Sequence, residues 1–92
     1  MKNQSHYFYV LQCQDNSFYA GYTIDIERRL KEHNDGKGAK YTRVESRRPV
    51  VLVHSEIFLS KSDAMKQEYA FKQLQRKEKQ EYLAFMKKIV NL

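Results

Sequence analysis

Two tyrosine-rich runs of strand-forming residues, separated by a short turn cluster, constrain the fold of this chain most. The first run, residues 7–13, reads Tyr-Phe-Tyr-Val-Leu-Gln-Cys, and the second, residues 18–22, reads Phe-Tyr-Ala-Gly-Tyr. Aromatic and β-branched residues favour strands, and the intervening Gln-Asp-Asn-Ser is typical of a turn. The two runs therefore predict a β-hairpin at the start of the domain.

The length of the hairpin loop decides whether Tyr9 and Tyr19 can share a site. A two-residue loop at 15–16 would place the two tyrosines on opposite faces of the hairpin. A loop of three or five residues, or a bulge, would place them on the same face. Gly21 stands beside this pair, and a glycine in a strand leaves room for a backbone or a ligand to approach.

Helical and strand patterns alternate along the rest of the chain. Asp25 is a candidate cap for a helix over residues 26–33, which Gly36 ends. After Pro49, residues 50–54 predict a buried strand that continues towards Phe58, and Ser60 then predicts the cap of a helix over residues 61–75. A last helix begins at about residue 78. The apolar faces expected for these three helices comprise Ile26, Leu30 and His33; Ala64, Met65, Phe71 and Leu74; and Tyr82, Phe85, Met86, Ile89 and Val90.

This β-β-α-β-α-α order predicts the fold class α+β, a three-stranded antiparallel sheet with helices packed around it. The 92 residues form one domain, 1–92, because nothing in the sequence resembles a linker or a repeat. A single cysteine, Cys13, excludes an internal disulfide, and no secretory apolar segment precedes the first strand. We therefore expect a cytoplasmic protein, with Cys13 as a small buried residue.

The charge balance favours a polyanionic partner. Lys and Arg outnumber Asp and Glu by 17 to 11, a net charge of +6. Such a surface attracts phosphate backbones, although the same charge also serves solubility. No stretch is long and apolar enough to span a bilayer, so we expect no membrane partner. A basic loop with one interleaved tyrosine resembles a backbone-binding strip that does not distinguish DNA from RNA: Lys37, Lys40, Tyr41, Arg43, Arg47 and Arg48.

Glu68 is anomalous because it falls within the apolar stripe of its helix. A carboxylate there requires a partner. One alternative is an ion pair with Lys72 at i+4, and the other is a hard divalent cation such as Mg²⁺. The sequence leaves both open. Arg29 and His33, also at i and i+4, project together and fit phosphate recognition with proton handling, or a solvated arginine above a packed histidine.

The ordered set of Tyr9, Tyr19, Arg29, His33 and Glu68 resembles the GIY-YIG nuclease family. The resemblance covers roughly residues 7–75, and residues 36–42 are similar to its small bacterial stand-alone subfamily, related to branched-DNA and repair nucleases. The chain departs from the motif at three points: residues 7–8 are Tyr-Phe, residue 20 is Ala, and residue 22 is Tyr where some relatives have Lys.

The resemblance implies hydrolysis of phosphodiester bonds with a single divalent cation, Mg²⁺ or Mn²⁺, and no small-molecule cofactor. Glu68 would hold the metal, supported by Lys72, and Tyr9 or Tyr19 would act as the general base. Arg29 would stabilise charge on the phosphate, and His33 would hydrogen-bond the tyrosine or water. The expected substrate is branched or duplex DNA, in repair or recombination. The main alternative is a nucleic-acid-binding module with weak or no cleavage, and a third is a basic structural protein.

Overall fold

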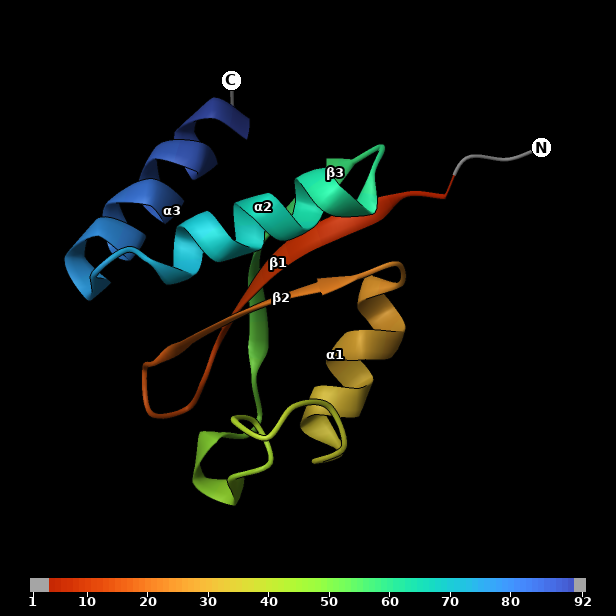
Figure 1. Ribbon diagram of the computed structural model, residues 1–92. Helices are drawn as coiled ribbons and strands as arrows, with labels where there is room; N and C mark the ends of the chain where they lie inside the picture. The colour runs from red at the N-terminus through yellow and green to blue at the C-terminus, as the bar shows by residue number, and fades with distance from the viewer. Residues whose placement is uncertain (1–3, 91–92) are drawn as a thin grey trace.

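The computed structural model describes residues 4–90. Its elements follow the predicted order, and the three strands form one antiparallel sheet in the order β2-β1-β3 (Figure 1). The elements are β1 (His6–Gln12), β2 (Phe18–Thr23), α1 (Ile26–Asn34), the 3₁₀ turn η1 (Glu45–Arg47), β3 (Val51–Phe58), α2 (Lys61–Lys72) and α3 (Arg76–Val90). The predicted fold class is confirmed.

The hairpin between β1 and β2 has the odd loop that a shared tyrosine site requires. Its loop spans residues 13–17, and Tyr9 pairs with Gly21 while Leu11 pairs with Tyr19. Residues that pair directly, and residues two apart on one strand, point to the same face of a sheet. Tyr9, Tyr19 and Gly21 therefore share one face.

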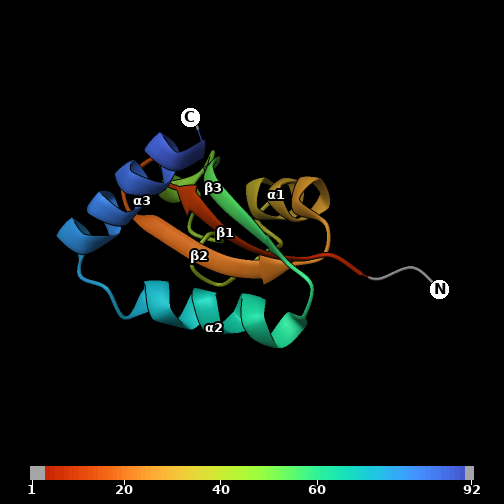
Figure 2. The same ribbon diagram turned by 90° about the horizontal axis from the view of Figure 1, so that it is seen from above.

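The central strand β1 separates two hydrophobic clusters. On one face, Phe8, Val10 and Ala20 pack against Phe71 of α2. On the other face, a second cluster contains Tyr9, Leu11, Cys13 and Val50, with Leu30 of α1 packed against it. The helices α1 and α2 accordingly lie on opposite sides of the sheet (Figure 2).

The caps of the first two helices lie where the sequence places them. The Asp25 side chain accepts a hydrogen bond from the Arg28 amide, and Ser60 accepts one from the Asp63 amide. Gly36, just past α1, has a φ of +77°, which glycine adopts without steric cost. The prediction for the end of α2 is wrong, because the helix ends at Lys72 rather than at residue 75.

The strand predicted from residue 50 towards Phe58 is present as β3, but the expectation that it is buried is wrong. Strand β3 lies at the edge of the sheet, and the side chains of Val51, Val53 and Ile57 are 52%, 40% and 61% exposed. A run of apolar residues suits a central strand, but the strand order gives that position to β1. Val50, just before β3, is buried in the second cluster.

The apolar faces of the last two helices are only partly buried. Met65 of α2 is 45% exposed, whereas Leu74, beyond its end, packs against the first cluster. In α3, Tyr82 packs against that cluster, but Phe85 and Ile89 are exposed. The Val90 side chain lies outside the described residues. Among residues 4–90, no helix combines the length and apolar character needed to cross a bilayer.

Candidate active site

The centre of the candidate site is a buried hydrogen bond between Tyr9 of β1 and His33 of α1. The Tyr9 hydroxyl lies 2.8 Å from His33 Nε2, and the two residues are 2% and 0% exposed. A Cβ on Gly21 would overlap the Tyr9 hydroxyl, so the phenol crosses β2 over this glycine. The space beside Gly21, which the sequence predicted would admit a backbone or a ligand, is therefore filled by the side chain of Tyr9.

Burial favours the neutral form of both members of this pair. Burial raises the pKa of Tyr9 to about 12, an effect that Arg29 opposes and that negative charge on Tyr19 or Glu68 adds to. Burial and then the charge of Arg29 lower the pKa of His33 from 6.5 to about 4. The unprotonated imidazole thus retains a lone pair that can accept a proton.

Arg29 lies on the same side of α1 as His33, as their spacing predicts. Its guanidinium donates to Glu32 Oε1 at 3.0 Å and to the Gly38 carbonyl at 3.4 Å. The Arg29 side chain is 29% exposed, so part of the guanidinium faces solvent. An arginine held at one end and open at the other is suited to contact a phosphate.

Tyr19 forms the outer wall of the site. Its ring centroid lies 6.5 Å from that of Tyr9 and 5.1 Å from that of His33. Tyr41 stacks on Tyr19 at 6.0 Å, and the Arg47 guanidinium lies 3.8 Å from the Tyr41 ring centroid. The site thus contains both tyrosines of the hairpin, but only Tyr9 bonds to the histidine.

Glu68 and Lys72 approach the tyrosines from α2. Lys72 Nζ lies 2.7 Å from Glu68 Oε2 and 5.8 Å from the Tyr19 ring centroid. The Glu68 side chain is 16% exposed, and it flanks the buried helix face that Ala64 and Phe71 form. The ion pair left open by the sequence is therefore present. The five residues of the ordered set lie around one site.

The carboxylate that this site offers to a metal is that of Glu68 on α2. In residues 4–90 no three His, Cys, Asp or Glu side chains are grouped to hold an ion. A structural zinc site is thereby ruled out for this region, because it needs four protein ligands. Mg²⁺ is often held by one or two carboxylates with waters and phosphate oxygens. Glu68 fits this pattern, and its carboxylate already binds a cationic group, the Lys72 ammonium.

The proposed nucleic-acid strip divides into two parts. Lys37, Lys40 and Arg43 are exposed. Arg47 instead donates to the Tyr41 carbonyl at 3.1 Å and pairs with Asp15, while Arg48 donates to the carbonyls of Asn34 and Arg43. The structure thus gives the last two arginines an internal role that the sequence did not indicate.

Thr42 belongs to the site and was missed. It is fully buried, and its Oγ1 lies 2.7 Å from His33 Nδ1. No local pattern in the sequence indicates this contact, because Thr42 and His33 are nine residues apart across an irregular loop. The contact depends on the loop path, which composition does not fix.

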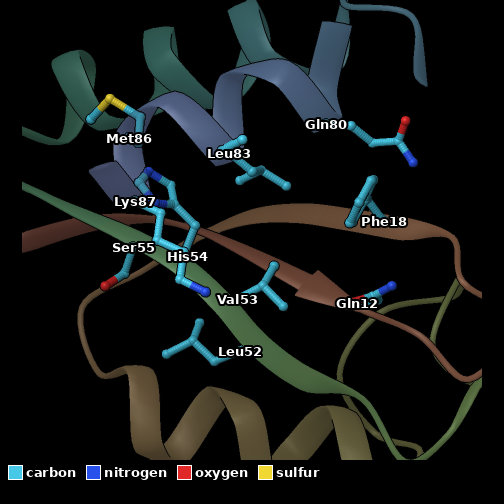
Figure 3. A pocket seen from close by; sticks show the side chains of 11 residues that line it. Gln12, Phe18, Leu52, Val53, His54, Ser55, Gln80, Leu83, Met86 and Lys87 are labelled. Carbon is cyan, nitrogen blue, oxygen red and sulfur yellow. The ribbon is translucent and has the colours of Figure 1, made fainter. Parts of the chain in front are cut away.

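A cavity of about 660 Å³ lies between β3 and α3, away from the candidate site (Figure 3). His54, Leu52 and Val53 line it from β3, and Leu83, Met86 and Lys87 line it from α3. None of the site residues described above contributes to its wall. Nearby, Glu56 accepts hydrogen bonds from Tyr82 and from His54, which ties α3 to the sheet.

The arrangement of sheet, tyrosines, α1 and α2 defines a nuclease-type domain. The sequence model of the family described as "GIY-YIG catalytic domain" matches residues 5–82. The chain therefore belongs to the GIY-YIG family, whose members in general act on nucleic acid as endonucleases.

Its relatives within the family are small bacterial proteins. A "UPF0213 protein" of Enterococcus faecalis is 62% identical over 84 residues, 90% of this chain and 96% of the relative. The UPF0213 protein YazA of Bacillus subtilis is 57% identical over 90% of this chain and 82% of its own. The solution NMR structure of the protein EF2693 from E. faecalis has 60% identity and a TM-score of 0.62, and covers 94% of this chain and 91% of that one.

Proposed function

We propose that this domain hydrolyses phosphodiester bonds of DNA with the help of a single divalent cation. The observation that carries the proposal is the Tyr9–His33 hydrogen bond, which lies beside a partly exposed arginine. A phenol joined to a neutral imidazole can relay a proton. Two further groups that hydrolysis of a phosphodiester requires lie nearby: the Arg29 guanidinium, which can bind a phosphate, and the Glu68 carboxylate on α2, which can hold a cation.

Tyr9 is the proposed general base, because its hydroxyl has a proton acceptor, His33 Nε2. Tyr9 takes a proton from the attacking water while its own proton passes to Nε2, so no free phenolate forms. The water oxygen bonds to phosphorus, and the bond from phosphorus to the leaving oxygen breaks. Solvent protonates the leaving oxygen, and the imidazolium returns its proton to solvent.

Arg29 connects substrate binding to this relay. Its charge is the second-largest cause of the low pKa of His33. A phosphate bound at the guanidinium would offset that charge, and the pKa of His33 would rise. The histidine would then accept a proton more readily when substrate is present than when it is absent.

Glu68 is the residue that would hold the cation. A bound Mg²⁺ supplies charge neutralisation at the phosphate and at the leaving oxygen. The Lys72 ammonium, 2.7 Å from Glu68 Oε2, balances the carboxylate in the metal-free protein. Lys72 would also place a second positive charge beside the phosphate.

The proposed substrate is branched or duplex DNA, in repair or recombination, and we place the protein in the cytoplasm. The exposed cations Lys37, Lys40 and Arg43 follow α1 in the chain, so a backbone bound at Arg29 would pass near them. Contacts of this kind carry little sequence information. Recognition by backbone shape therefore suits this surface better than recognition of a base sequence.

The test compares cleavage of branched and duplex DNA in Mg²⁺, in Mn²⁺ and in chelator. Glu68→Gln, which keeps the shape of the side chain, should abolish cleavage. The matched control is Glu81→Gln on α3, which replaces an exposed glutamate and should leave the rate unchanged. Mn²⁺ binding, followed by electron paramagnetic resonance, should weaken in Glu68→Gln alone.

Two further variants separate the tyrosines. Tyr9→Phe should lower the cleavage rate by about 100-fold or more. Tyr19→Phe should retain most of the activity, since Tyr19 contacts the site through its ring. The reverse result would assign the base to Tyr19. Binding of DNA without cleavage in any metal, unaffected by Glu68→Gln, would overturn the nuclease proposal in favour of a binding module.

A further inference from the structure

The second ring nitrogen of His33 is held as firmly as the first. His33 Nδ1 lies 2.7 Å from Thr42 Oγ1, and both residues are fully buried. Thr42 Oγ1 in turn lies 3.3 Å from the Ala39 carbonyl oxygen and 3.4 Å from the Ala39 amide nitrogen. A chain of hydrogen bonds therefore runs from Tyr9 through the imidazole and the threonine to the loop backbone.

The protons on this chain can be assigned by counting donors. The hydroxyl of neutral Tyr9 must donate, and within residues 4–90 its hydrogen-bond acceptor is His33 Nε2. Arg29, the other polar neighbour, only donates. Nε2 therefore carries no proton, and a neutral imidazole must carry its proton on Nδ1. Nδ1–H donates to Thr42 Oγ1, and the Thr42 hydroxyl donates to the Ala39 carbonyl.

The opposite assignment leaves a buried donor without an acceptor. If Thr42 donated to Nδ1, the imidazole proton would sit on Nε2 and point at the Tyr9 oxygen. The phenolic proton would then have no acceptor in the described structure, and the Ala39 carbonyl would lose its bond from Thr42. Unpaired buried donors are rare because water cannot replace the lost bond.

Gly38 allows the loop to close on the histidine. A Cβ at this position would lie 2.5 Å from His33 Nδ1 and 2.9 Å from its Cα. Any larger residue would push the loop away from the ring and take Thr42 with it. The Gly38 carbonyl also accepts a hydrogen bond from Arg29. The loop therefore contacts two residues of α1, Arg29 and His33, at this one glycine.

We propose that Thr42 is a positioning residue that fixes His33 in the Nδ1-protonated tautomer, so that Nε2 faces Tyr9 as a proton acceptor. The tautomer follows from the hydrogen bonds alone, while its effect on catalysis rests on the nuclease function proposed above. At metal sites, the buried partner that sets the tautomer of a histidine commonly contributes 10- to 100-fold to activity, and we expect a contribution of about this size here.

The direct test is the ¹⁵N spectrum of His33 in the wild-type protein at pH 7, with the signals assigned through a His33→Asn variant. Two-bond proton–nitrogen correlations distinguish a protonated Nδ1 from a protonated Nε2. A protonated Nδ1 is expected. A protonated Nε2 overturns the proposal, whatever any variant does.

Thr42→Val and Thr42→Ser extend the test, since valine keeps the shape and serine keeps the hydroxyl. In Thr42→Val the tautomers should mix and kcat should fall by about 10- to 100-fold with little change in KM. Thr42→Ser should keep both the Nδ1-protonated tautomer and the kcat of the wild-type protein. An unchanged tautomer in a folded Thr42→Val contradicts the proposal. If no protein cleaves DNA in any metal, the nuclease function fails, while the spectra still decide the role of Thr42.

Discussion

The Tyr9 hydroxyl and His33 Nε2 lie 2.8 Å apart inside the domain, where Tyr9 is 2% exposed and His33 is fully buried. The bond joins the central strand of the sheet to α1, so it belongs to the core as well as to the candidate site. Replacing either residue should therefore change stability and activity together. To separate the effect on activity from the effect on stability, a variant at this bond is compared with the same substitution at a partly buried tyrosine elsewhere in the fold.

Tyr9→Phe should lower the cleavage rate by about 100-fold or more, because general-base contributions are of that size. It should also lower the free energy of unfolding by roughly 1–2 kcal/mol, since His33 Nε2 loses a buried partner. Urea unfolding and a single-turnover cleavage assay measure the two effects.

The control for this change is Tyr82→Phe. Tyr82 donates to Glu56 and accepts from Gln67 at 3.1 Å, on the other side of the sheet. Its loss should destabilise the protein by about 1 kcal/mol and leave cleavage intact. Equal losses of activity in both variants would show that Tyr9 acts through stability and not through proton transfer.

His33 should make the stability of the domain depend on pH. Its pKa is about 4 in the folded protein and 6.5 when unperturbed, so the unfolded chain binds more protons between these values. Stability is then complete above about pH 6.5 and is lost as the pH falls towards 4. The loss between pH 7 and pH 4.5 should be on the order of 2 kcal/mol.

Urea unfolding at pH 7, 5.5 and 4.5 measures this loss. The range stays above the usual carboxylate pKa of 3.8, so that Asp15 and Asp35, whose pKa values are lowered by their partners, contribute little. His33→Asn should be less stable at pH 7 but should lack the pH-dependent part. A wild-type stability that is flat over this range would mean that burial does not lower the pKa of His33.

Local patterns were sufficient to predict the elements, whereas most of the candidate site came from the family resemblance. The hairpin and both helix caps depend on neighbours in sequence, and they are confirmed. The sequence left open whether Tyr9 and Tyr19 share a face, and the five-residue loop decides that they do. The anomaly at Glu68 also came from a helical wheel. The structure resolves it only in part, because the Lys72 pair is present and metal binding is still a prediction.

The errors come from contacts that are distant in sequence. The apolar run in β3 does not reveal that β1 takes the centre of the sheet, which leaves Val51 and Ile57 exposed. Gly21 was expected to admit a backbone or a ligand, whereas the space beside it is filled by the Tyr9 ring from the paired strand. Thr42 was missed because its partner lies nine residues away across an irregular loop. Each of these three contacts depends on the path of the chain and not on the local conformational preference of the residues.

Gly21→Ala should disturb the site without changing any chemical group in it. The added methyl group would overlap the Tyr9 hydroxyl, so the phenol or β2 must shift, which disturbs the 2.8 Å bond to His33. Overpacking of this kind costs about 1–3 kcal/mol, and cleavage should fall along with it. The ¹⁵N signal of His33 Nε2 reports the lost bond directly. If Gly21→Ala leaves both this signal and the cleavage rate unchanged, β2 has moved enough to accommodate the methyl group.

The basic loop should divide into residues that bind DNA and a residue that holds the loop. Lys37 and Lys40 are exposed, and among residues 4–90 neither forms an ion pair. Lys37→Ala and Lys40→Ala should each weaken binding to any duplex and lower the salt dependence by about one phosphate contact. Fluorescence anisotropy between low and moderate salt measures that slope, and the melting temperature should not change.

Arg47→Ala should behave differently although it removes the same charge. Arg47 bonds to the Tyr41 carbonyl and lies over the Tyr41 ring, which stacks on Tyr19. Its loss should lower stability by about 1–2 kcal/mol and loosen the wall of the site. Cleavage should therefore fall more than the loss of one phosphate contact explains. If Arg47→Ala changes only the salt dependence, as the lysine variants do, the arginine is part of the DNA-binding strip after all.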